Sequence, residues 1–417
     1  MRQLDILNDE IYKWDNAQRI CDLIIASAVE SWSSDIHIEP LSNVVRVRFR
    51  VDWILKVIVE YQTFIHPQIV ARYKILSNLK IDESRMPQDG RISTVINDKW
   101  LDLRVSTLPT VHWEKIVMRI VDKSKKVPPL EVLWIEWHNW DVLDKAISQP
   151  NGIVLTSWPT WSGKSTTLYS CLMNLNTPDV NIMTLEDPVE NTLDWVNQSQ
   201  VFPDIGYSFA SGLRTALRQD PDIIMVWEIR DKETINIAIE ASLTWHLVLS
   251  TIHTNSAAET LTRILNMWIP AFLLPASVNA IMAQRLIRRL CKHCKKSVTV
   301  EELDPKLKSQ VKKTIWKITK EELTRRVPAE ILKNPLFYVP VWCEHCDNTW
   351  YSWRVWIYEV MEITPILKEY IIKGESSVAM NDAAIEWWMI SLEMDWIIKA
   401  LNGMTSLEES YGAVKEN

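Results

Sequence analysis

Residues 157–170, SWPTWSGKSTTLYS, carry the most informative chemical pattern in the chain. Gly163, Lys164 and Ser165 complete the second half of the pattern G-x-x-x-x-G-K-[ST]. In that pattern backbone N–H groups cradle phosphates, the lysine reaches the terminal phosphates and the hydroxyl holds Mg²⁺. The apolar run GIVLTS precedes the pattern and a helical segment follows, which is the context that a phosphate-binding loop requires. Trp158, however, occupies the position of the first glycine.

We therefore predict a nucleotide-binding loop that ends in a helix, with Lys164 acting on the phosphates and Ser165 on Mg²⁺. The residues expected to bind the nucleotide are Trp158, Pro159, Thr160, Trp161, Ser162, Gly163, Lys164, Ser165 and Thr166.

Acidic residues follow two further buried strands. Glu228 comes directly after DIIMVW, and Glu186 lies at the end of IMTLE, with Asp187 and Glu190 just beyond it. Nucleotide hydrolysis needs a carboxylate at such a place, to hold the metal's water or to activate the attacking one. The alternative is that these acids only cap the next helix, and for Asp187 and Glu190 both interpretations stay open.

Two histidines bracket another apolar run, in LTWHLVLSTIHTN. His246 precedes the run and His253 follows it. A histidine near a phosphate could sense the terminal phosphate or donate a hydrogen bond to it. A lone histidine at a strand end is more often structural. This pattern alone therefore does not decide between a role at the phosphate and a structural role.

Two C-x-x-C pairs, separated by 48 residues, form an independent signal: Cys291, Cys294, Cys343 and Cys346. Such pairs are typical of a tetrahedral zinc site, whereas disulfides are the weaker interpretation in a reducing compartment. His293 and His345 could replace a sulfur ligand, although the spacing favours sulfur. Cys21 and Cys171 lie in apolar helical contexts and are expected to be core residues.

Length and composition bound the class of protein. A chain of 417 residues with 47% hydrophobic and 24% charged residues is expected to fold into two or three globular domains. The net charge of −7 argues against bulk binding of nucleic acid. No apolar run is long enough for a bilayer and the N-terminus lacks a signal-peptide core, so we expect an intracellular protein.

The elements that must position these residues follow from periodicity. Residues 16–31 and 66–82 predict helices, and residues 44–51 predict a half-buried strand whose open face carries three arginines, either solvated or facing an anion or partner. From residue 150 on, short apolar runs alternate with helical segments, which predicts a parallel sheet covered on both faces. The predicted divisions are an N-terminal α+β domain (1–122), a linker (123–133), an ATPase core (134–290), a tetracysteine subdomain (291–346) and a helical C-terminal subdomain (347–417).

The counts of 8 glycines and 22 tryptophans are abnormal. Together they match the glycine share of about 7% expected of an ordinary protein of this length. Trp53 stands in FRVDWILK, where a hairpin favours Asp-Gly. Trp353 and Trp356 alternate through YSWRVWIYEV, and Trp396 follows Asp in EMDWIIKA, where glycine is also expected. A side chain in the left-handed region costs about 1–2 kcal/mol, so a dozen cases would exceed a total stability of about 5–15 kcal/mol.

Our hypothesis is that the gene encodes glycine with UGA, as some bacterial lineages do, and that the printed chain has tryptophan at those codons. The alternative is a truly tryptophan-rich protein. The codons at positions 158, 161 and 227 decide between the two, because UGG there would end the hypothesis.

Nine stretches occur along the chain in this order: SSDIHIEP, RVRFRVD, RMPQDGRI, DLRVSTLPT, PTWSGKSTTLY, LEDPVE, LRQDPDIIMVWEIRD, LTWHLVLSTIHTN and AQRLIRRLC. In these stretches, from about residue 32 to the C-terminus, the chain resembles the type II secretion and type IV pilus assembly ATPases. That family has glycine where this chain has Trp32, Trp53, Trp113, Trp158, Trp161, Trp227, Trp245, Trp268, Trp342, Trp350, Trp353 and Trp356.

The resemblance implies an α/β fold: a RecA-like P-loop ATPase core, an N-terminal α+β (PAS-like) domain, a Cys₄ zinc subdomain and a helical C-terminal region. Residues 158–165 match the Walker A box. Glu186 matches the likely general base and Glu228 the Walker B acid. The family's histidine box falls on the two histidines of LTWHLVLSTIHTN.

Arginines supply a second group of implied site residues. Arg104 and Arg119 match N-terminal arginines that reach the nucleotide phosphates, and there they would couple hydrolysis to domain motion. Arg214 and Arg218 are further candidates, with a structural ion pair as the open alternative. The four-cysteine site favours an assembly ATPase, because pilus retraction ATPases lack it.

The resemblance also implies ATP, Mg²⁺ and Zn²⁺ as cofactors and a homo-hexamer at the cytoplasmic face of the inner membrane. Its partners would be a membrane platform protein and, indirectly, pilin-like subunits, without direct nucleic-acid contact. Larger family members carry an extra N-terminal domain, so we expect recruitment here to be simpler. The alternatives are a DNA-uptake or conjugative secretion ATPase, or an inactive structural ring subunit if the tryptophans are real.

Overall fold

The computed structural model describes residues 3–13, 16–51, 54–124, 126–157, 164–346 and 350–409. The chain forms two compact units, Met1–Lys126 and Val127–Asn417. The division falls inside the segment 123–133 that the sequence predicts to be a linker. The second half of that segment already belongs to the core of the second unit, because Leu130 and Leu133 are buried there.

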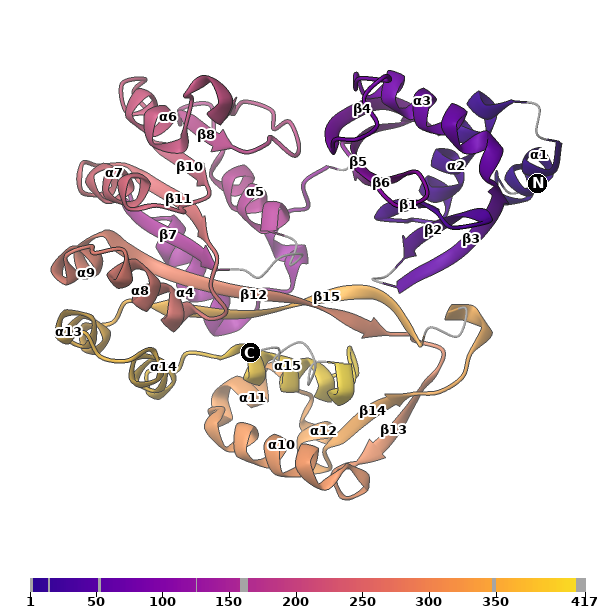
Figure 1. Ribbon diagram of the computed structural model, residues 1–417. Helices are drawn as coiled ribbons and strands as arrows, with labels where there is room; N and C mark the ends of the chain where they lie inside the picture. The colour runs from indigo at the N-terminus through magenta and orange to yellow at the C-terminus, as the bar shows by residue number, and fades with distance from the viewer. Residues whose placement is uncertain are drawn as a thin grey trace. The chain divides into compact units, whose positions relative to one another are not determined.

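The first unit is a six-stranded antiparallel sheet with helices on one face (Figure 1). The strand order is β3-β2-β1-β6-β5-β4. Its elements are α1 (Gln3–Lys13), α2 (Ala17–Glu30), β1 (Asp35–Pro40), β2 (Val44–Val51), β3 (Ile54–Gln62), α3 (His66–Leu76), β4 (Gln88–Ile96), β5 (Lys99–Pro109) and β6 (Glu114–Asp122).

Local sequence explains these elements. Alternation in β2 buries Val45, Val47 and Phe49 against the helices and leaves the arginines on the open face. Asn16 caps α2 by accepting a hydrogen bond from the backbone N–H of Arg19. The predicted helix at 16–31 and strand at 44–51 are confirmed, whereas the helix predicted for 66–82 ends at residue 76.

The three arginines on the open face of β2 are each paired with an acid. Arg46 contacts Glu60 at 2.7 Å and Arg48 contacts Glu39 at 2.8 Å. The third arginine of the strand, Arg50, lies 3.5 Å from a carboxylate of β1. This end of the sheet is therefore a lattice of ion pairs rather than a bare cationic surface.

The second unit is built on a seven-stranded sheet with the order β15-β12-β7-β11-β10-β8-β9. Six of these strands run parallel to one another, and the seventh, β15, pairs antiparallel with β12. The strands are β7 (Gly152–Ser157), β8 (Ile182–Glu186), β9 (Asn197–Gln200), β10 (Ile223–Trp227), β11 (Leu247–Ile252), β12 (Val278–Leu290) and β15 (Tyr351–Glu362).

Helices cover both faces of this sheet, as the sequence predicts. Ile153 and Leu155 pack into one core, and Val154 between them packs into the core on the opposite face. The first core is closed by α6 (Phe209–Ala216), α7 (Lys232–Leu243), α8 (Ala257–Asn266), α9 (Leu274–Ser277), α13 (Pro365–Lys373) and α14 (Ser377–Glu386). The second core is closed by α4 (Trp137–Ile147) and α5 (Lys164–Leu175).

The segment after residue 347 differs from the helical subdomain that the sequence predicts. Residues 351–362 form β15, which extends the seven-stranded sheet beside β12. Only the residues after this strand are helical, in α13, α14 and α15 (Leu392–Leu401). The apolar alternation of β15 is visible in the sequence, but its partner strand lies some 70 residues earlier.

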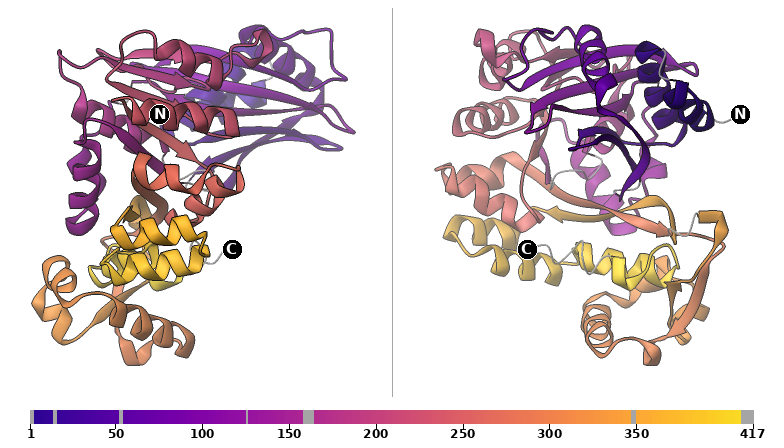
Figure 2. Two further views of the ribbon diagram at one scale, coloured as in Figure 1. Left: turned by 90° about the vertical axis from the view of Figure 1, so that its left-hand side faces the viewer. Right: turned by 45° about the vertical axis from the view of Figure 1, so that its right-hand side comes forward.

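The predicted tetracysteine subdomain is not a separate body. It contains β13 (Lys295–Thr299), α10 (Pro305–Lys317), α11 (Lys320–Arg326), α12 (Ala329–Lys333) and β14 (Leu336–Pro340). Helix α15 lies between this insert and the strands β12 and β15 (Figures 1 and 2). Val311 and Phe337 of the insert share one core with Ile397 and Leu401 of α15.

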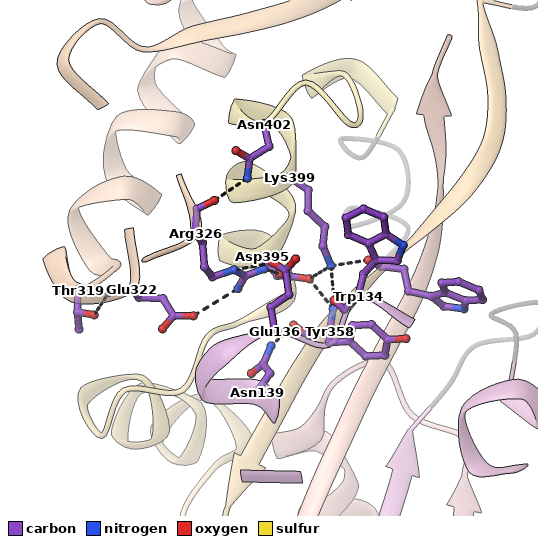
Figure 3. A network of polar contacts seen from close by, with 11 residues as sticks. Trp134, Glu136, Asn139, Thr319, Glu322, Arg326, Tyr358, Asp395, Lys399 and Asn402 are labelled. Atoms are coloured by element: carbon purple, nitrogen blue, oxygen red, sulfur yellow. Dashed lines mark hydrogen bonds and ion pairs between the residues drawn. The ribbon is translucent and has the colours of Figure 1, made fainter. Parts of the chain in front are cut away.

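A buried charge network ties α15, α11 and α4 together (Figure 3). Asp395 accepts hydrogen bonds from Arg326, from the Lys399 ammonium at 2.8 Å and from the backbone N–H of Tyr358 at 2.8 Å. Lys399 also donates to the carbonyl oxygens of Trp356 (2.6 Å) and Trp134 (3.3 Å). The network therefore joins the insert to the sheet through the last long helix.

The guanidinium in this network has two further acids nearby. Arg326 lies 3.2 Å from Glu136, at the start of α4, and 3.4 Å from Glu322. The charged side chains of Asp395, Lys399 and Arg326 are each about 1% exposed.

The backbone supports the glycine hypothesis at many tryptophans. Among the described residues, thirteen non-glycine residues have positive φ. Four are Asn or Asp, which tolerate this region, and nine are tryptophan, which does not. Those nine are Trp32, Trp134, Trp137, Trp195, Trp245, Trp268, Trp350, Trp353 and Trp388.

The tryptophans with positive φ agree only in part with the glycine positions that the sequence predicts. Trp134, Trp137, Trp195 and Trp388 were not expected from the sequence. Trp396, expected in a turn, instead lies inside α15 with 0% of its surface exposed, so the turn argument is wrong there. Of the other expected glycine positions, Trp113, Trp227, Trp342 and Trp356 are outside the positive-φ set, and Trp53, Trp158 and Trp161 lie outside the described residues.

Candidate nucleotide site

Parallel pairing brings four strand ends to one edge of the second sheet. In register, Ser157 of β7 stands opposite Ile252 of β11, and Trp227 of β10 stands opposite Glu186 of β8. Because β7, β11, β10 and β8 are consecutive in the sheet, the residues that follow them lie at the same carboxyl edge. This edge therefore collects the predicted loop and the predicted acids.

The loop itself, residues 158–163, lies outside the described residues, as do the side chains of Lys164 and Ser165. The segments on both sides of the loop form hydrogen bonds with the rest of the second unit. The Ser157 hydroxyl donates to the carbonyl oxygen of Thr254 at 2.8 Å, which ties the end of β7 to the segment after β11. Helix α5 begins at Lys164, and its Thr167 hydroxyl donates to Gln284 at 2.8 Å.

Glu186 is buried and held by three donors. The Thr184 hydroxyl (2.6 Å) and the Gln198 amide (2.9 Å) donate to one carboxylate oxygen, and the Tyr169 hydroxyl donates to the other. Burial raises the pKa of Glu186, although these hydrogen bonds act in the opposite direction. A fixed carboxylate with a raised pKa suits a group that accepts a proton from water.

Glu228 follows β10 directly and is paired on both oxygens. His253 contacts one carboxylate oxygen and Arg230 contacts the other. Burial would raise the pKa of Glu228, but the hydrogen bond and charge of His253, together with Arg230, lower it to about 2. The carboxylate is therefore ionised at neutral pH, as a group that orders a metal's water must be.

The sequence predicts that His246 and His253 bracket a core strand, and the structure shows that strand between them. His246 precedes β11 and His253 follows it, so six residues of strand, roughly 20 Å, lie between the two ends. The His246 ring contacts the carbonyl oxygen of Ala241 at 3.0 Å, at the end of α7. His253 shares the carboxyl edge with the acids, and His246 lies at the opposite edge.

The candidate arginines fall into two groups. Arg214 forms an exposed ion pair with Glu233, and Arg218 donates to the carbonyl oxygen of Arg214 at 2.8 Å, which fits the structural alternative. Arg104 and Arg119 belong to the first unit, where they stand directly opposite each other on β5 and β6.

The four cysteines converge as predicted. The sulfur atoms of Cys291, Cys294, Cys343 and Cys346 all lie within 4.8 Å of one another. The sulfurs of Cys294 and Cys346 are 3.7 Å apart, far beyond a disulfide bond and close to the edge of about 3.8 Å of a tetrahedron with 2.3 Å zinc–sulfur bonds. The cluster fits Zn²⁺.

The remaining cysteines behave as the sequence predicts. Cys21 and Cys171 are buried and unpaired, and burial raises the pKa of each thiol to about 12. Both are inert core residues.

Comparison with known proteins gives the family. Residues 13–412 match the family described as "Type II/IV secretion system protein". The chain belongs to this family. Similarity to individual relatives is high: 44% identity to the type IV pilus assembly ATPase PilB of Pseudomonas aeruginosa, covering 95% of this chain and 67% of the relative. A type II secretion system protein E of Aeromonas hydrophila is 39% identical over 96% of this chain and 76% of its own length.

Two solved structures share the fold. The Legionella pneumophila ATPase DotB aligns with a TM-score of 0.67 and 20% identity, over 95% of each chain. The pilus retraction motor PilT, solved with bound ADP, aligns with a TM-score of 0.63 and 22% identity, over 94% of this chain and 96% of its own. These matches agree with the mixed α/β architecture expected from the sequence.

The site contains residues that sequence reasoning missed. Tyr169, Gln198 and Arg230 contact the two key acids but carry no motif of their own. Arg230 could have been noticed, because it stands two residues after Glu228 in WEIRD. Tyr169 and Gln198 approach from a helix and an edge strand, so only the tertiary fold identifies them.

Proposed function

We propose that this chain is a Mg²⁺-dependent ATP-hydrolysing motor for type IV pilus assembly or type II protein secretion. One observation carries the proposal: Glu186, Glu228 and His253 follow neighbouring strands at the sheet edge where β7 ends, and His253 contacts Glu228. The segment with Gly163-Lys164-Ser165 connects the end of β7 to α5. Membership of a family that includes named pilus and secretion ATPases supports it.

The proposed roles follow from the surroundings of each residue. The loop N–H groups and Lys164 hold the phosphates, and Ser165 would hold Mg²⁺, which supplies charge neutralisation at the phosphates. Glu228, ionised and oriented by His253 and Arg230, orders the water around the metal. Glu186 accepts the proton of the attacking water after exchanging one of its three donors for that water.

The remaining features of the proposal come from the family resemblance. Arg104 and Arg119 bind phosphates from the first unit, so that hydrolysis drives rigid-body motion. The working form is a homo-hexamer on an inner-membrane platform protein, which extracts pilin-like subunits without direct contact to nucleic acid. The site of action is the cytoplasmic face of the inner membrane. Among the described residues, no helix combines the length and apolarity needed to cross a bilayer.

The zinc site is proposed to be structural. All four sulfurs are turned toward one another beside the β13–β14 ribbon, which leaves no open coordination position for a substrate.

A second candidate function, a catalytically inactive ring subunit, is favoured if the indoles are real, because bulk at positions 158 and 161 would obstruct the phosphate path. Nine tryptophans with positive φ argue that many of these positions are glycine in the natural protein.

Comparison of the printed chain with a chain carrying Trp158→Gly and Trp161→Gly tests both candidates. We expect Mg²⁺-dependent ATP turnover in the glycine form and its loss in Lys164→Ala of that form. Equal turnover of the two chains would refute our account of the loop, and absence of turnover from both would refute the motor.

A further inference from the structure

The turn that follows β11, residues 253–256, carries His253 and leads directly into α8. The His253 ring contacts the Glu228 carboxylate, so the position of this turn decides whether that contact forms. The His253 side chain is 44% exposed, and packing around the ring alone therefore does not fix its place. The groups that hold the backbone of the turn are then part of the question of how the site is built.

Two neighbouring strands of the sheet hold this backbone. From β15, the Glu359 carboxylate accepts a hydrogen bond from the N–H of Ala257 at 2.9 Å, at the point where the turn becomes α8. From β12, the Arg285 guanidinium donates to the carbonyl oxygen of Asn255 at 3.2 Å. Strands β12 and β15 thus fix both the middle and the end of the turn.

The Glu359 carboxylate serves two helix N-termini at once. One oxygen accepts from Ala257, the first residue of α8, and the other accepts at 3.3 Å from the N–H of Leu392, the first residue of α15. Helix N-termini present unpaired N–H groups and partial positive charge, which a carboxylate satisfies. Glu359 therefore joins the turn before α8 to the helix that carries the buried Asp395 network.

The surroundings of Glu359 make this arrangement specific. Its side chain is buried, and burial raises the pKa of Glu359, whereas the two N–H donors and Arg285 act in the opposite direction. An acid is costly to bury unless such donors surround it. The carboxylate is consequently tied to these two backbone groups rather than free to choose others.

A cavity of about 210 Å³ borders the turn. Its lining is mostly polar and includes Asn255, Ser256, Arg285 and Glu359. A space of this size has room for several water molecules, so tightly packed apolar side chains do not support the turn on this side. The position of the turn there depends on the hydrogen bonds of Arg285 and Glu359.

We propose that Glu359 and Arg285 are positioning residues of the nucleotide site, which hold residues 253–257 so that His253 stays in contact with Glu228. Both act through the backbone of the turn. The catalytic consequence rests on the proposed function, whereas the placement of the His253 ring can be measured without it.

The test compares Glu359→Gln and Arg285→Gln with Glu362→Gln, each in the full chain that carries glycine at positions 158 and 161. Glutamine at position 359 keeps one acceptor oxygen but turns an NH₂ group toward the second backbone N–H. Glu362 is the matched control, because it lies on the same strand and pairs with Lys145 of α4 at 2.6 Å.

Four quantities are measured for each variant: kcat, the affinity for a fluorescent nucleotide, the urea midpoint and the NMR signal of the His253 ring, which is assigned with His253→Gln. The kinetic comparison is repeated with His253→Gln as the background. A residue that acts through His253 loses its effect on kcat in that background, whereas a residue needed only for folding does not.

We expect Glu359→Gln and Arg285→Gln to lower kcat by about 10- to 100-fold, because a displacement of about 1 Å in a catalytic site costs that much. Both should keep nucleotide affinity within about threefold of the parent, since neither is proposed to bind the nucleotide. Both should shift the His253 signal, and both should change kcat by less than about twofold in the His253→Gln background. Glu362→Gln should leave the His253 signal in place and kcat within about twofold of the parent.

An equal loss of kcat in the two backgrounds would overturn the inference, and so would an unchanged His253 signal in both variants. If Glu359→Gln does not fold, Arg285→Gln decides alone, because Arg285 is only partly buried. If the parent hydrolyses no ATP, the proposed function fails. The placement of His253 by Glu359 and Arg285 is then upheld by a shifted ring signal in these variants and refuted by an unchanged one.

Discussion

Replacement of Asp395 by Asn is the sharpest test of how the second unit holds together. The substitution keeps the shape of the side chain and leaves an amide oxygen that can still accept from the Tyr358 N–H. It removes the negative charge that lies between Arg326 and Lys399, both of which are about 1% exposed, and it replaces one acceptor oxygen by an NH₂ donor. The experiment therefore tests the charge and the acceptor together, without changing the volume of the side chain.

The expected loss of stability follows from the partners that each cation retains in Asp395→Asn. Arg326 keeps Glu136 at 3.2 Å and Glu322 at 3.4 Å, whereas Lys399 keeps the carbonyl oxygens of Trp134 and Trp356 but no other acid within 4.0 Å among the described residues. Removal of one partner from a buried pair typically costs about 3–5 kcal/mol, because a charge is left unpaired away from water. We expect a loss in that range, a large part of a total stability of about 5–15 kcal/mol.

The pH dependence gives a second signature. Burial would raise the pKa of Asp395, but Lys399 and Arg326 outweigh it and lower the pKa. A carboxyl whose folded pKa is depressed contributes stability above its unfolded pKa of about 3.9 and loses it as the pH falls through the folded value. The deficit of Asp395→Asn should therefore be constant from about pH 6 to 8 and shrink below about pH 4.

Urea unfolding of the second unit, followed by near-UV circular dichroism, measures the effect. Glu321→Gln is the control, because Glu321 forms an exposed pair with Arg325 on the same helix as Arg326. It should shift stability by less than about 1 kcal/mol. The double variant Asp395→Asn/Lys399→Met should recover part of the loss, since it removes the stranded ammonium. A single variant no less stable than Glu321→Gln would refute this reasoning.

Three further predictions concern the site, the metal and the tryptophans. Glu186→Gln should slow ATP turnover by about 10²- to 10⁴-fold while leaving binding of a fluorescent nucleotide intact, and a parallel loss of binding would contradict its role as a base. Cys343→Ser should reduce bound zinc, measured by plasma mass spectrometry, from about one ion per chain to near zero, whereas Cys171→Ser should retain it. Trp268→Gly should stabilise the printed chain by about 1–2 kcal/mol in urea unfolding, because Trp268 is 83% exposed and has a φ of 62°. Replacement of the buried Trp396 by Gly should instead lower the stability by about 3–5 kcal/mol. Effects of the same sign for the two variants would contradict the backbone argument.

Much of the site was predictable because it follows from strand order. Glu228 and His253 each come directly after an apolar run, and parallel strands bring such residues to one edge. The same run separates the two histidines by the length of a strand, so His246 lies at the opposite edge from the acids. The C-x-x-C pairs needed no fold at all, since their spacing already specifies a shared ligand.

The rest depends on contacts between distant segments. Strand β15 has a clear alternating pattern, but nothing local reveals that it joins the ATPase sheet beside β12. The donors around Glu186 come from α5 and β9, whose approach is set by packing. Arg91, Arg104 and Arg119 are likewise aligned by register, because they lie in separate stretches of the chain and the pairing of β4, β5 and β6 places them opposite one another.

The position of β15 has a consequence for synthesis of the protein on the ribosome. Strand β12 is complete once residue 290 has emerged, but its outer hydrogen-bonding edge stays open until residues 351–362 follow. During that interval the nascent chain presents a 13-residue strand that neighbouring polypeptides could pair with. Prematurely terminated products that end within the insert would keep this unpaired strand edge permanently. They would therefore be substrates for chaperones or proteases.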